Sequence, residues 1–464
     1  MKQNKLKYSL FFLLGLFSCK KEREPNIIII LIDDAGYADF GFMGSNDLQT
    51  PNIDCLANEG VIFTDAHTTS TVCAPSRAGI LTGKYQQRFG FECNEIPAGM
   101  GLDTNQVLLP LALKEKGYAT LAIGKWHLGD KGKYLPSNRG FDEFYGFYGG
   151  ARSYFPYPAD EKTDSEKRLR NNTEITEFEG YLTDRFGDRA VEFIEENKNK
   201  AFFIYFSPNA VHSPMEARED HLERFKNAKR PVLSAMMWSL DENIGKITDK
   251  LKEEKIYDNT LIFFLSDNGG ALSNHASCEP LKGWKGNKYE GGHRVPFFIT
   301  WPAKIKDGKK FEGLTSSLDI YPTSLRAAGM DIPLCDGTDL LAFLTGERSG
   351  NPHSELYWRK DKMAAARSGS LKLVRVEGYG SNLYDLNTDP GEENNLASID
   401  TSGAQLLSNN LLKWESEMKE PGWREAEEWN KVNMEIHQAL MQNREPMYKN
   451  PRELREYCKK PETK

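Results

Sequence analysis

Four short apolar runs, three of them preceded by a helix-like stretch, constrain the fold of this 464-residue chain more than any other feature. The first run, residues 27–32, reads IIIILI, which is typical of a strand that is covered on both faces. Similar runs follow at residues 119–123, 201–206 and 260–265. The helix-like stretches occupy residues 106–116, 183–197 and 232–252. This alternation predicts βαβ units, and therefore an α/β fold with a mainly parallel sheet sandwiched by helices.

The sequence pattern changes at about residue 345. Short runs at residues 356–358, 363–367 and 371–376 resemble antiparallel strands with tight turns, and a charged helical segment follows at 400–443. The chain is also longer than one compact domain usually is. We therefore expect a large domain over residues 25–344 and a smaller C-terminal α+β domain, of antiparallel sheet plus helix, over residues 345–464.

Residues 1–19 have the pattern of an export signal. Three lysines precede the apolar run 10–17, which is too short to span a bilayer. The run ends in LFSC and resembles a bacterial lipoprotein signal peptide with Cys19 as the lipidated lipobox cysteine. Ordinary secretory cleavage near Ser18 is the alternative. Both predict an extracytoplasmic protein, and lipidation predicts a membrane-anchored lipoprotein that faces the periplasm or the cell surface.

Charge and cysteine spacing argue against several classes of protein. The chain has 60 basic and 67 acidic residues and a net charge of -7, so it lacks the basic excess of a nucleic-acid binder. Its remaining cysteines are widely spaced and form no CxxC pair, which argues against a zinc site and a dense disulfide framework. These cysteines are Cys55, Cys73, Cys93, Cys278, Cys335 and Cys458.

Polar residues follow each of the four predicted strands. They are Asp33 and Asp34 after the first, Lys125 and His127 after the second, His212 after the third, and Asp267 and Asn268 after the fourth. Each group alone is compatible with a turn, a helix cap or a structural histidine. The carboxyl ends of parallel strands, however, form one edge, where ligands bind. Because the four groups coincide in this way, we expect them to converge on one site.

The residue types at this edge indicate a particular chemistry. Carboxylate and amide oxygens suit a hard divalent cation, calcium before magnesium, and argue against zinc or copper. Lys125, His127, His212 and Arg77 would add cationic or proton-donating groups around the same point. This combination is typical of a site for the ester of a strong oxyacid.

The segment CAPSRAGILTG, residues 73–83, has the pattern of a helix start. Pro75 suits the first turn, and Arg77 falls one turn after Cys73. The free N–H groups of a helix N-terminus favour anion binding, so Cys73 is expected where an anion would dock. A bare thiol there could be a nucleophile with a lowered pKa, although a thiolate is a poor match for a calcium-type oxygen site.

The motifs together resemble the formylglycine-dependent (type I) sulfatases of the alkaline phosphatase-like superfamily, including bacterial carbohydrate sulfatases. The first matching motif is CAPSR followed by AGILTGKY. Further motifs match in the order that the family has them, namely PNIIIILIDDAGYADFG, GKWHLG, the His212 segment, SDNGG and residues 282–296. The resemblance covers residues 25–396. It implies a large mixed sheet, one calcium ion, and a maturation enzyme that generates formylglycine from Cys73. It also implies a sulfatase that hydrolyses sulfate esters of a sulfated carbohydrate.

The resemblance also implies roles for individual residues. Asp33, Asp34, Asp267 and Asn268 match the calcium ligands, which an oxygen of the modified Cys73 completes. The hydrated aldehyde would attack sulfur with one hydroxyl, and the other would then release sulfate. Arg77 and Lys125 match residues that position the hydrated aldehyde, which is a geminal diol. His127 matches the base that assists turnover of this diol. His212 and Lys285 match groups that hold the sulfate and help to protonate the leaving oxygen.

The sequence departs from the family's pattern near the expected substrate mouth. Val211 replaces a frequent proline and Trp284 a frequent glycine. Five residues are candidate contacts for a sulfated sugar, although each is equally compatible with packing or surface: His275, Trp284, Arg88, Arg152 and Tyr154. One alternative function is a phosphomonoesterase or phosphodiesterase of the same superfamily. A non-catalytic glycan-binding lipoprotein is another, and it predicts an unmodified thiol at Cys73.

Overall fold

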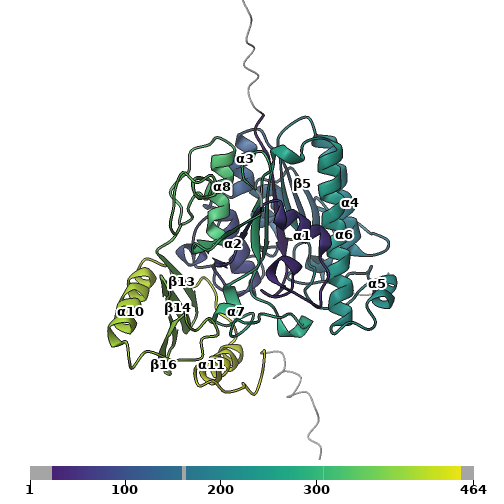
Figure 1. Ribbon diagram of the computed structural model, residues 1–464. Coiled ribbons are helices and arrows are strands. Elements are labelled where there is room, and N and C mark those ends of the chain that lie inside the picture. The colour runs from purple at the N-terminus through teal and green to yellow at the C-terminus, as the bar shows by residue number, and fades with distance from the viewer. Residues whose placement is uncertain (1–22, 159–163, 307, 451–464) are drawn as a thin grey trace, which may run out of the picture.

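The computed structural model describes residues 23–158, 164–306 and 308–450 (Figure 1). The predicted signal peptide, residues 1–19 with Cys19, lies outside the described residues. Within the described ranges, no helix has both the length and the apolar character that crossing a membrane requires.

The large domain is built on a ten-stranded mixed sheet in the order β11-β2-β10-β9-β1-β8-β4-β5-β6-β7. Its centre is parallel and consists of β9 (Thr260–Ser266), β1 (Asn26–Ile32), β8 (Phe202–Ser207), β4 (Ala119–Lys125) and β5 (Glu143–Phe147). The antiparallel β10 (Phe297–Thr300) joins β9 to the edge strands β2 (Val61–Phe63) and β11 (Lys309–Phe311). At the other edge lie β6 (Arg170–Asn171) and β7 (Glu174–Ile175).

Helices cover both faces of this sheet, as the continuous apolar character of β1 predicts (Figure 1). Ile28, Ile30 and Ile32 belong to a core with α1 (Pro51–Asn58), α4 (Leu182–Asn197) and α6 (Pro231–Glu253). The alternate residues of the same strand belong to a core with α2 (Cys73–Thr82), α3 (Leu109–Glu115) and α8 (Ile320–Ala327). Successive side chains of a strand point to opposite faces, so one strand supplies both cores.

The C-terminal domain is a four-stranded antiparallel sheet between two helices. Its strands, in order, are β13 (Glu355–Lys360), β14 (Met363–Ser368), β15 (Leu371–Val376) and β16 (Gly380–Asp385). Helix α10 (Thr401–Ser416) packs through Leu407, Leu411 and Trp414. Helix α11 (Glu427–Met441) packs through Val432, Ile436 and Leu440 in a separate core.

These observations confirm the predicted fold class, a mainly parallel α/β sheet with a smaller antiparallel C-terminal unit. All four predicted central strands are present. The helical segment expected at 400–443 is instead two helices, with a break over residues 417–426. Pro421 and Gly422 lie in that break, and both disfavour a continuous helix. The remaining short elements are β3 (Ala66–His67), β12 (Thr315–Ser316), α5 (Glu219–Arg224), α7 (Glu290–His293) and α9 (Leu341–Leu344).

Candidate active site

The carboxyl ends of four adjacent strands bring the predicted polar residues together. Asp33 and Asp34 follow β1, Asp267 follows β9, and Lys125 ends β4. Ligand atoms of Asp33, Asp34, Asp267 and Cys73 all lie within 4.8 Å of one another, and all four residues are buried. The convergence follows from topology, because β9, β1, β8 and β4 are neighbours in the sheet.

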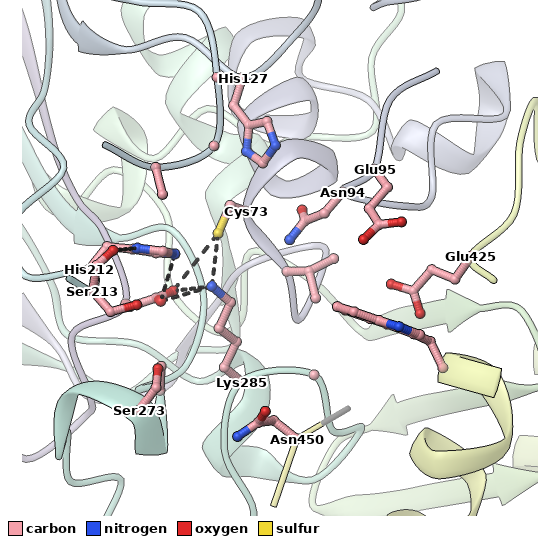
Figure 2. A pocket seen from close by; sticks show the side chains of 18 of the residues that line it. Cys73, Asn94, Glu95, His127, His212, Ser213, Ser273, Lys285, Glu425 and Asn450 are labelled. Carbon is pink, nitrogen blue, oxygen red and sulfur yellow. Dashed lines mark hydrogen bonds and ion pairs between the residues drawn. The ribbon is translucent and has the colours of Figure 1, made fainter. Parts of the chain in front are cut away.

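Cys73 is the first residue of α2, and Figure 2 shows its side chain between those of His127, His212 and Lys285. Its Sγ is 3.6 Å from Asp33 Oδ1, 3.8 Å from Asp34 Oδ1 and 3.2 Å from Lys285 Nζ. Burial, reinforced by the charge of Asp267, raises the pKa of the Cys73 thiol to about 12. The thiol is therefore protonated at neutral pH, which disfavours an activated thiolate at this position.

Arg77 ties α2 to the ends of three strands. Its Nε and Nη2 donate to Asp267 Oδ2 at 3.0 and 2.8 Å. Its Nη1 donates to the carbonyl oxygen of Lys125 at 3.1 Å and to Ser207 Oγ at 2.5 Å. Burial opposes the charge of this guanidinium, but Asp267 outweighs burial and raises the pKa of Arg77. A charged, fully buried side chain thus fixes the relative positions of β9, β4 and β8.

Two lysines neutralise the other carboxylates of the cluster. Lys125 Nζ lies 3.0 and 2.8 Å from the two oxygens of Asp33. Lys285 Nζ lies 2.8 Å from Asp34 Oδ2. Burial acts to raise the pKa of Asp34. The neighbouring Lys285, His212 and Lys125 outweigh burial and lower this pKa well below its usual value. With Arg77 beside Asp267, three carboxylates face three cations, so ionised side chains can persist in this buried site.

Asn268 supplies evidence that this cluster fits a cation. Its Nδ2 donates to Asp34 Oδ1 at 2.8 Å and to the carbonyl oxygen of Gly269 at 2.9 Å. Its Oδ1 is buried and accepts no hydrogen bond from the described residues. Such an atom is unfavourable unless another group satisfies it. An amide oxygen beside three carboxylates is a donor set that suits a hard divalent cation, so Asp33, Asp34, Asp267 and Asn268 fit such an ion.

Two histidines face Cys73 from different strand ends. His212 Nε2 is 3.5 Å from Asp34 Oδ2, and its Nδ1 is 2.5 Å from the carbonyl oxygen of Ser213. Burial lowers the pKa of His212 to about 3, because Lys285 and Lys125 add to burial and outweigh Asp34. Burial and Lys125 also hold the pKa of His127 well below its usual value. Both imidazoles are therefore neutral and able to accept a proton.

A cavity of about 570 Å³ opens from this cluster (Figure 2). Its inner end is lined by Asp34, Cys73, His127, His212 and Lys285. Its outer part is lined by residues from both domains, among them Asn94, Glu95, Asp130, Glu166, Trp284, Lys360, Glu425, Trp429, Asn433 and Ile436. Four of the predicted catalytic residues, Cys73, His127, His212 and Lys285, thus line one cavity, whereas the predicted Arg77 and Lys125 are paired with Asp267 and Asp33 and do not line it.

The structure places only one of the five candidate sugar contacts, Trp284, on the cavity wall. The exposed His275 and the half-buried Arg88 are not among the described residues that line it, and Arg88 Nη2 instead pairs with Asp336 Oδ1 at 2.7 Å. Arg152 is buried between the rings of Tyr157 and Phe178, with its guanidinium 5.0 and 5.1 Å from their centroids. These three side chains have other partners or lie elsewhere, so we do not retain them as sugar contacts.

Tyr154, the fifth candidate, lies behind the site. It is fully buried, and its hydroxyl oxygen is 2.6 Å from the carbonyl oxygen of Asn209 and 2.7 Å from that of His212. It therefore holds the segment that carries His212 and does not face a ligand.

Two parts of the site have no clear signal in the sequence. Asn94 Oδ1 accepts a hydrogen bond from the backbone N–H of Ala74 at 2.9 Å, which ties a cavity-lining loop to the first turn of α2. Residues of α11 reach the cavity through the packing of the C-terminal domain. No local pattern identifies either, and Asn94 contacts Ala74, 20 positions earlier, only because the intervening chain folds back onto α2.

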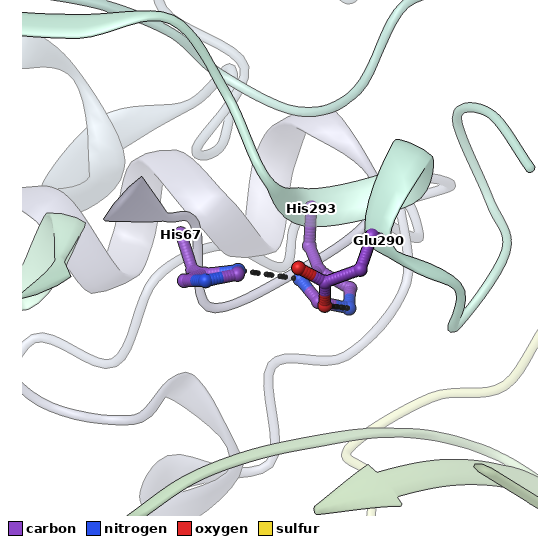
Figure 3. Close-up of side chains that lie close together, drawn as sticks. All are labelled: His67, Glu290 and His293. Atoms are coloured by element: carbon purple, nitrogen blue, oxygen red, sulfur yellow. Dashed lines mark hydrogen bonds and ion pairs between the residues drawn. The ribbon is translucent and has the colours of Figure 1, made fainter. Parts of the chain in front are cut away.

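A second buried cluster, His67, Glu290 and His293, also has the residue types of a metal site (Figure 3). His67 Nδ1 and His293 Nδ1 are 3.0 Å apart, so one of these nitrogens donates a proton to the other. Glu290 accepts a hydrogen bond from Lys372 at 3.0 Å and lies 3.4 Å from Arg367. Because cations and protons occupy its ligand atoms, we assign this cluster to the joint between the two domains.

Comparisons with known proteins agree with this geometry. The sulfatase family model matches residues 25–330, and the model of the N-sulphoglucosamine sulphohydrolase C-terminal region matches residues 283–419. N-acetylgalactosamine-6-sulfatase of Homo sapiens is 32% identical over 384 residues, 77% of this chain and 73% of that protein. Arylsulfatase G of Mus musculus is 32% identical over 406 residues, 77% of this chain and 75% of that protein.

Solved structures agree as well. The crystal structure of Ps i-CgsB in complex with k-i-k-neocarrahexaose matches with a TM-score of 0.83 and 36% identity, over 89% of this chain and 97% of that one. PsFucS1 sulfatase from Pseudoalteromonas sp. matches with a TM-score of 0.72 and 26% identity, over 85% and 90%. The family model covers the whole strand-end cluster and more than half of the chain. This chain therefore belongs to the sulfatase family and is a sulfuric ester hydrolase.

Proposed function

We propose that this enzyme hydrolyses sulfate esters of a sulfated carbohydrate. The observation that carries the proposal is the position of Cys73, at a helix N-terminus among oxygen ligands and lysines, at the closed end of a two-domain cavity. The carbohydrate part rests on relatives, since one is a sulfatase of N-acetylgalactosamine 6-sulfate by name and another structure holds a neocarrahexaose.

We propose further that Cys73 is converted to formylglycine by a maturation enzyme. The pKa of about 12 makes the unmodified thiol a poor nucleophile at neutral pH. Hydrated formylglycine would supply one hydroxyl that attacks sulfur while the S–O bond to the sugar alcohol breaks, and a second hydroxyl whose loss of a proton lets the diol collapse to the aldehyde and release sulfate. The side chain would remain within reach of Asp33, Asp34 and Lys285, which already surround the sulfur atom.

Calcium is the cation that we propose for Asp33, Asp34, Asp267 and Asn268. It would supply positive charge and Lewis acidity toward a sulfate oxygen. The charge balance supports this proposal, because Arg77, Lys125 and Lys285 are already matched by three carboxylates. A bound sulfate ester adds one negative charge that these lysines and this arginine do not offset.

The roles proposed for the chain's own residues follow from their contacts. Lys285 and His212 both lie beside Asp34 at the cavity, so they can hold the sulfate group, and the Lys285 ammonium can supply a proton to the leaving oxygen. His127, neutral and with its Nδ1 free of hydrogen bonds to the described residues, can accept the proton of a hydroxyl at position 73. Arg77 and Lys125 pair with Asp267 and Asp33 and so fix the positions of these two carboxylates.

Localisation forms a separate proposal, because it rests on residues 1–19 alone. We propose that the protein is exported and anchored through a lipid on Cys19. The Cys19→Ala substitution should move the protein from the membrane fraction to the soluble fraction, which fractionation of bacterial cells that produce the protein would measure. An unchanged membrane fraction would show that the anchor is elsewhere.

The experiment that tests the proposed function has two parts. Protein produced together with a formylglycine-generating enzyme is first examined by mass spectrometry of the Cys73 tryptic peptide, in which we expect an aldehyde in place of the thiol. Sulfate release is then measured over defined sulfated oligosaccharides, with matched phosphate mono- and diesters as comparators. Full activity with an untouched thiol, or faster turnover of the phosphate esters, would overturn the proposal.

A further inference from the structure

The cavity beyond Cys73 is closed on one side by the C-terminal domain. This side is lined by three residues of α11, Trp429, Asn433 and Ile436, and by Glu425, which comes shortly before that helix. Glu425 Oε1 is held by Lys360 Nζ at 2.6 Å, and its carboxylate also lies 3.2 Å from Asn433 Nδ2. This wall is therefore fixed by a nearly buried ion pair, and the half-buried ring of Trp429 lies on it.

The opposite side of the cavity is the loop that carries Asn94 and Glu95. Figure 2 shows Asn94 and Glu95 beside Cys73, with Glu425 facing them from the C-terminal domain. The bond from the Ala74 N–H to Asn94 Oδ1 fixes the loop and leaves the Asn94 amide N–H groups available as donors. Cys73 lines the same cavity as these two sides, so the space between them can hold the group that bears the scissile sulfate.

The charges around this outer space are predominantly negative. Its ammonium groups are each matched by a carboxylate, namely Lys360 by Glu425 at 2.6 Å, Lys167 by Asp164 at 2.8 Å and Lys449 by Glu445 at 2.9 Å. Glu95, Asp130 and Glu166 also line the cavity, and within the described part of the chain they form no ion pair. A second sulfate or a uronate in this space would therefore meet uncompensated carboxylates.

We propose that the ring beside the scissile sulfate is an uncharged sugar held between Trp429 of the C-terminal domain and the Asn94–Glu95 loop. The proposal rests on the carbohydrate sulfatase function proposed above and assigns its substrate class. An aromatic ring packs on the apolar face of a sugar, and carboxylates accept hydrogen bonds from its hydroxyls. The fixed amide of Asn94 adds donors for ring or hydroxyl oxygens.

The first test is Trp429→Ala. We expect KM for a mono-sulfated oligosaccharide of otherwise uncharged sugars to rise about tenfold or more, while kcat/KM for the small ester 4-nitrophenyl sulfate stays within about twofold. Tyr379→Ala is the matched control, because Tyr379 is a 43% exposed aromatic residue of the same domain that does not line the cavity. Equal losses on both substrates, or no loss on the oligosaccharide, would overturn the assignment.

The second test concerns charge. Wild-type enzyme should prefer a ring with one sulfate over the same ring with two, and Glu95→Gln should reduce that preference by roughly 3- to 10-fold at low salt. Glu428→Gln is the control, since Glu428 is an exposed carboxylate at the start of α11 that does not line the cavity. A wild-type preference for the disulfated ring, or equal effects of the two variants, would contradict the proposal.

A binding measurement separates this proposal from the proposed function. Calorimetry of the unsulfated oligosaccharide needs no turnover, and we expect wild type to bind it and Trp429→Ala to lose at least about tenfold in affinity. Absence of sulfate release from every ester, with sugar binding retained, would refute the sulfatase function and leave the sugar site standing. Sulfate release with no difference in binding between wild type and Trp429→Ala would refute the sugar site alone.

Discussion

Two buried clusters of this protein each consist of residue types that can ligate a metal ion, and yet they differ in what their ligand atoms can do. The first joins Asp33, Asp34 and Asp267 to Cys73, and the second contains His67, Glu290 and His293. In the first, the oxygen of Asn268 is left without a hydrogen bond among the described residues, and a cavity leads to the cluster.

The second cluster is closed by partners from the other domain. Arg367 Nη2 lies 2.7 Å from Asp65 Oδ2, and Lys372 Nζ lies 3.0 Å from Glu290 Oε1. Trp358 stacks on His293 with 3.9 Å between ring centroids. Residue type and burial alone therefore do not identify a metal or reaction site. Free lone pairs and access distinguish the first cluster, whereas complete pairing makes the second a structural joint.

The largest expected effect comes from removing the sulfur atom of the first cluster. Cys73→Ala should lower kcat/KM by a factor on the order of 10⁴ or more, because it removes the proposed nucleophile. The free energy of unfolding should change by only about 1 kcal/mol, since the substitution deletes one small atom. Cys278→Ala, at another buried free cysteine, should retain activity. Substantial activity in Cys73→Ala, measured by sulfate release, would place the nucleophile elsewhere.

A substitution beside the second cluster should lower the free energy of unfolding and leave the rate of sulfate release largely unchanged. Arg367→Met removes the guanidinium that lies 2.7 Å from Asp65 Oδ2 and leaves that carboxylate with the more distant Arg294 at 3.6 Å, so we expect a loss of about 3 kcal/mol in the free energy of unfolding. Urea unfolding measures it, with sulfate release at 25 °C as the readout of the intact site. The control Arg375→Met breaks a more exposed pair, Arg375 with Glu415 at 2.7 Å, and should cost about 1 kcal/mol or less. Equal losses in the two variants would show that the second cluster is not a special joint.

Much of the first cluster could be predicted from sequence, and the reason is topological. Asp33 follows a run of six apolar residues and Asp267 follows another, and parallel strands end at one edge whatever lies between them in the chain. The prediction for these carboxylates depends only on local pattern and on the rules of sheet connection. The helix start at Cys73 predicted only an anion-docking position, and the resemblance to the sulfatase family placed this residue beside the carboxylates.

The outer cavity could not be predicted in this way, because its walls depend on long-range packing. Arg88 has the residue type of a sulfate contact, but Asp336, 248 positions away, pairs with it. Trp429 lies on a helix whose apolar face is readable, whereas the cavity it reaches depends on which face of the C-terminal sheet that helix covers. Arginine and aromatic side chains serve packing and binding equally, so only the fold distinguishes their roles.

Removal of the metal should affect the first cluster and not the second. We expect it to lower the free energy of unfolding by less than the Arg367→Met substitution does. If calcium is present at about 100 times its Kd, chelation should lower the free energy of unfolding by about 2.7 kcal/mol and abolish sulfate release. Asn268→Ala should weaken this calcium dependence, because the variant lacks the oxygen that has no other partner. His293→Gln, in the second cluster, should leave the calcium-dependent increment unchanged. Thermal unfolding with and without calcium measures all three, and a calcium increment lost in His293→Gln but kept in Asn268→Ala would reverse our assignment.

The smallest expected effect is a pH dependence that belongs to the second cluster. Burial opposes ionisation of Asp65, but the hydrogen bond with His67 and the charges of Arg367 and Arg294 outweigh it and lower its pKa to about 2. A carboxyl with a lower pKa in the folded state adds stability above its unfolded value, and this stability is lost as the pH falls from about 4 through 2. The shift corresponds to about 2 kcal/mol. The difference in unfolding free energy between wild type and Asp65→Asn should therefore shrink by about that amount between pH 5 and pH 2. Parallel curves for the two proteins over this range would mean that the cations around Asp65 do not stabilise its charge.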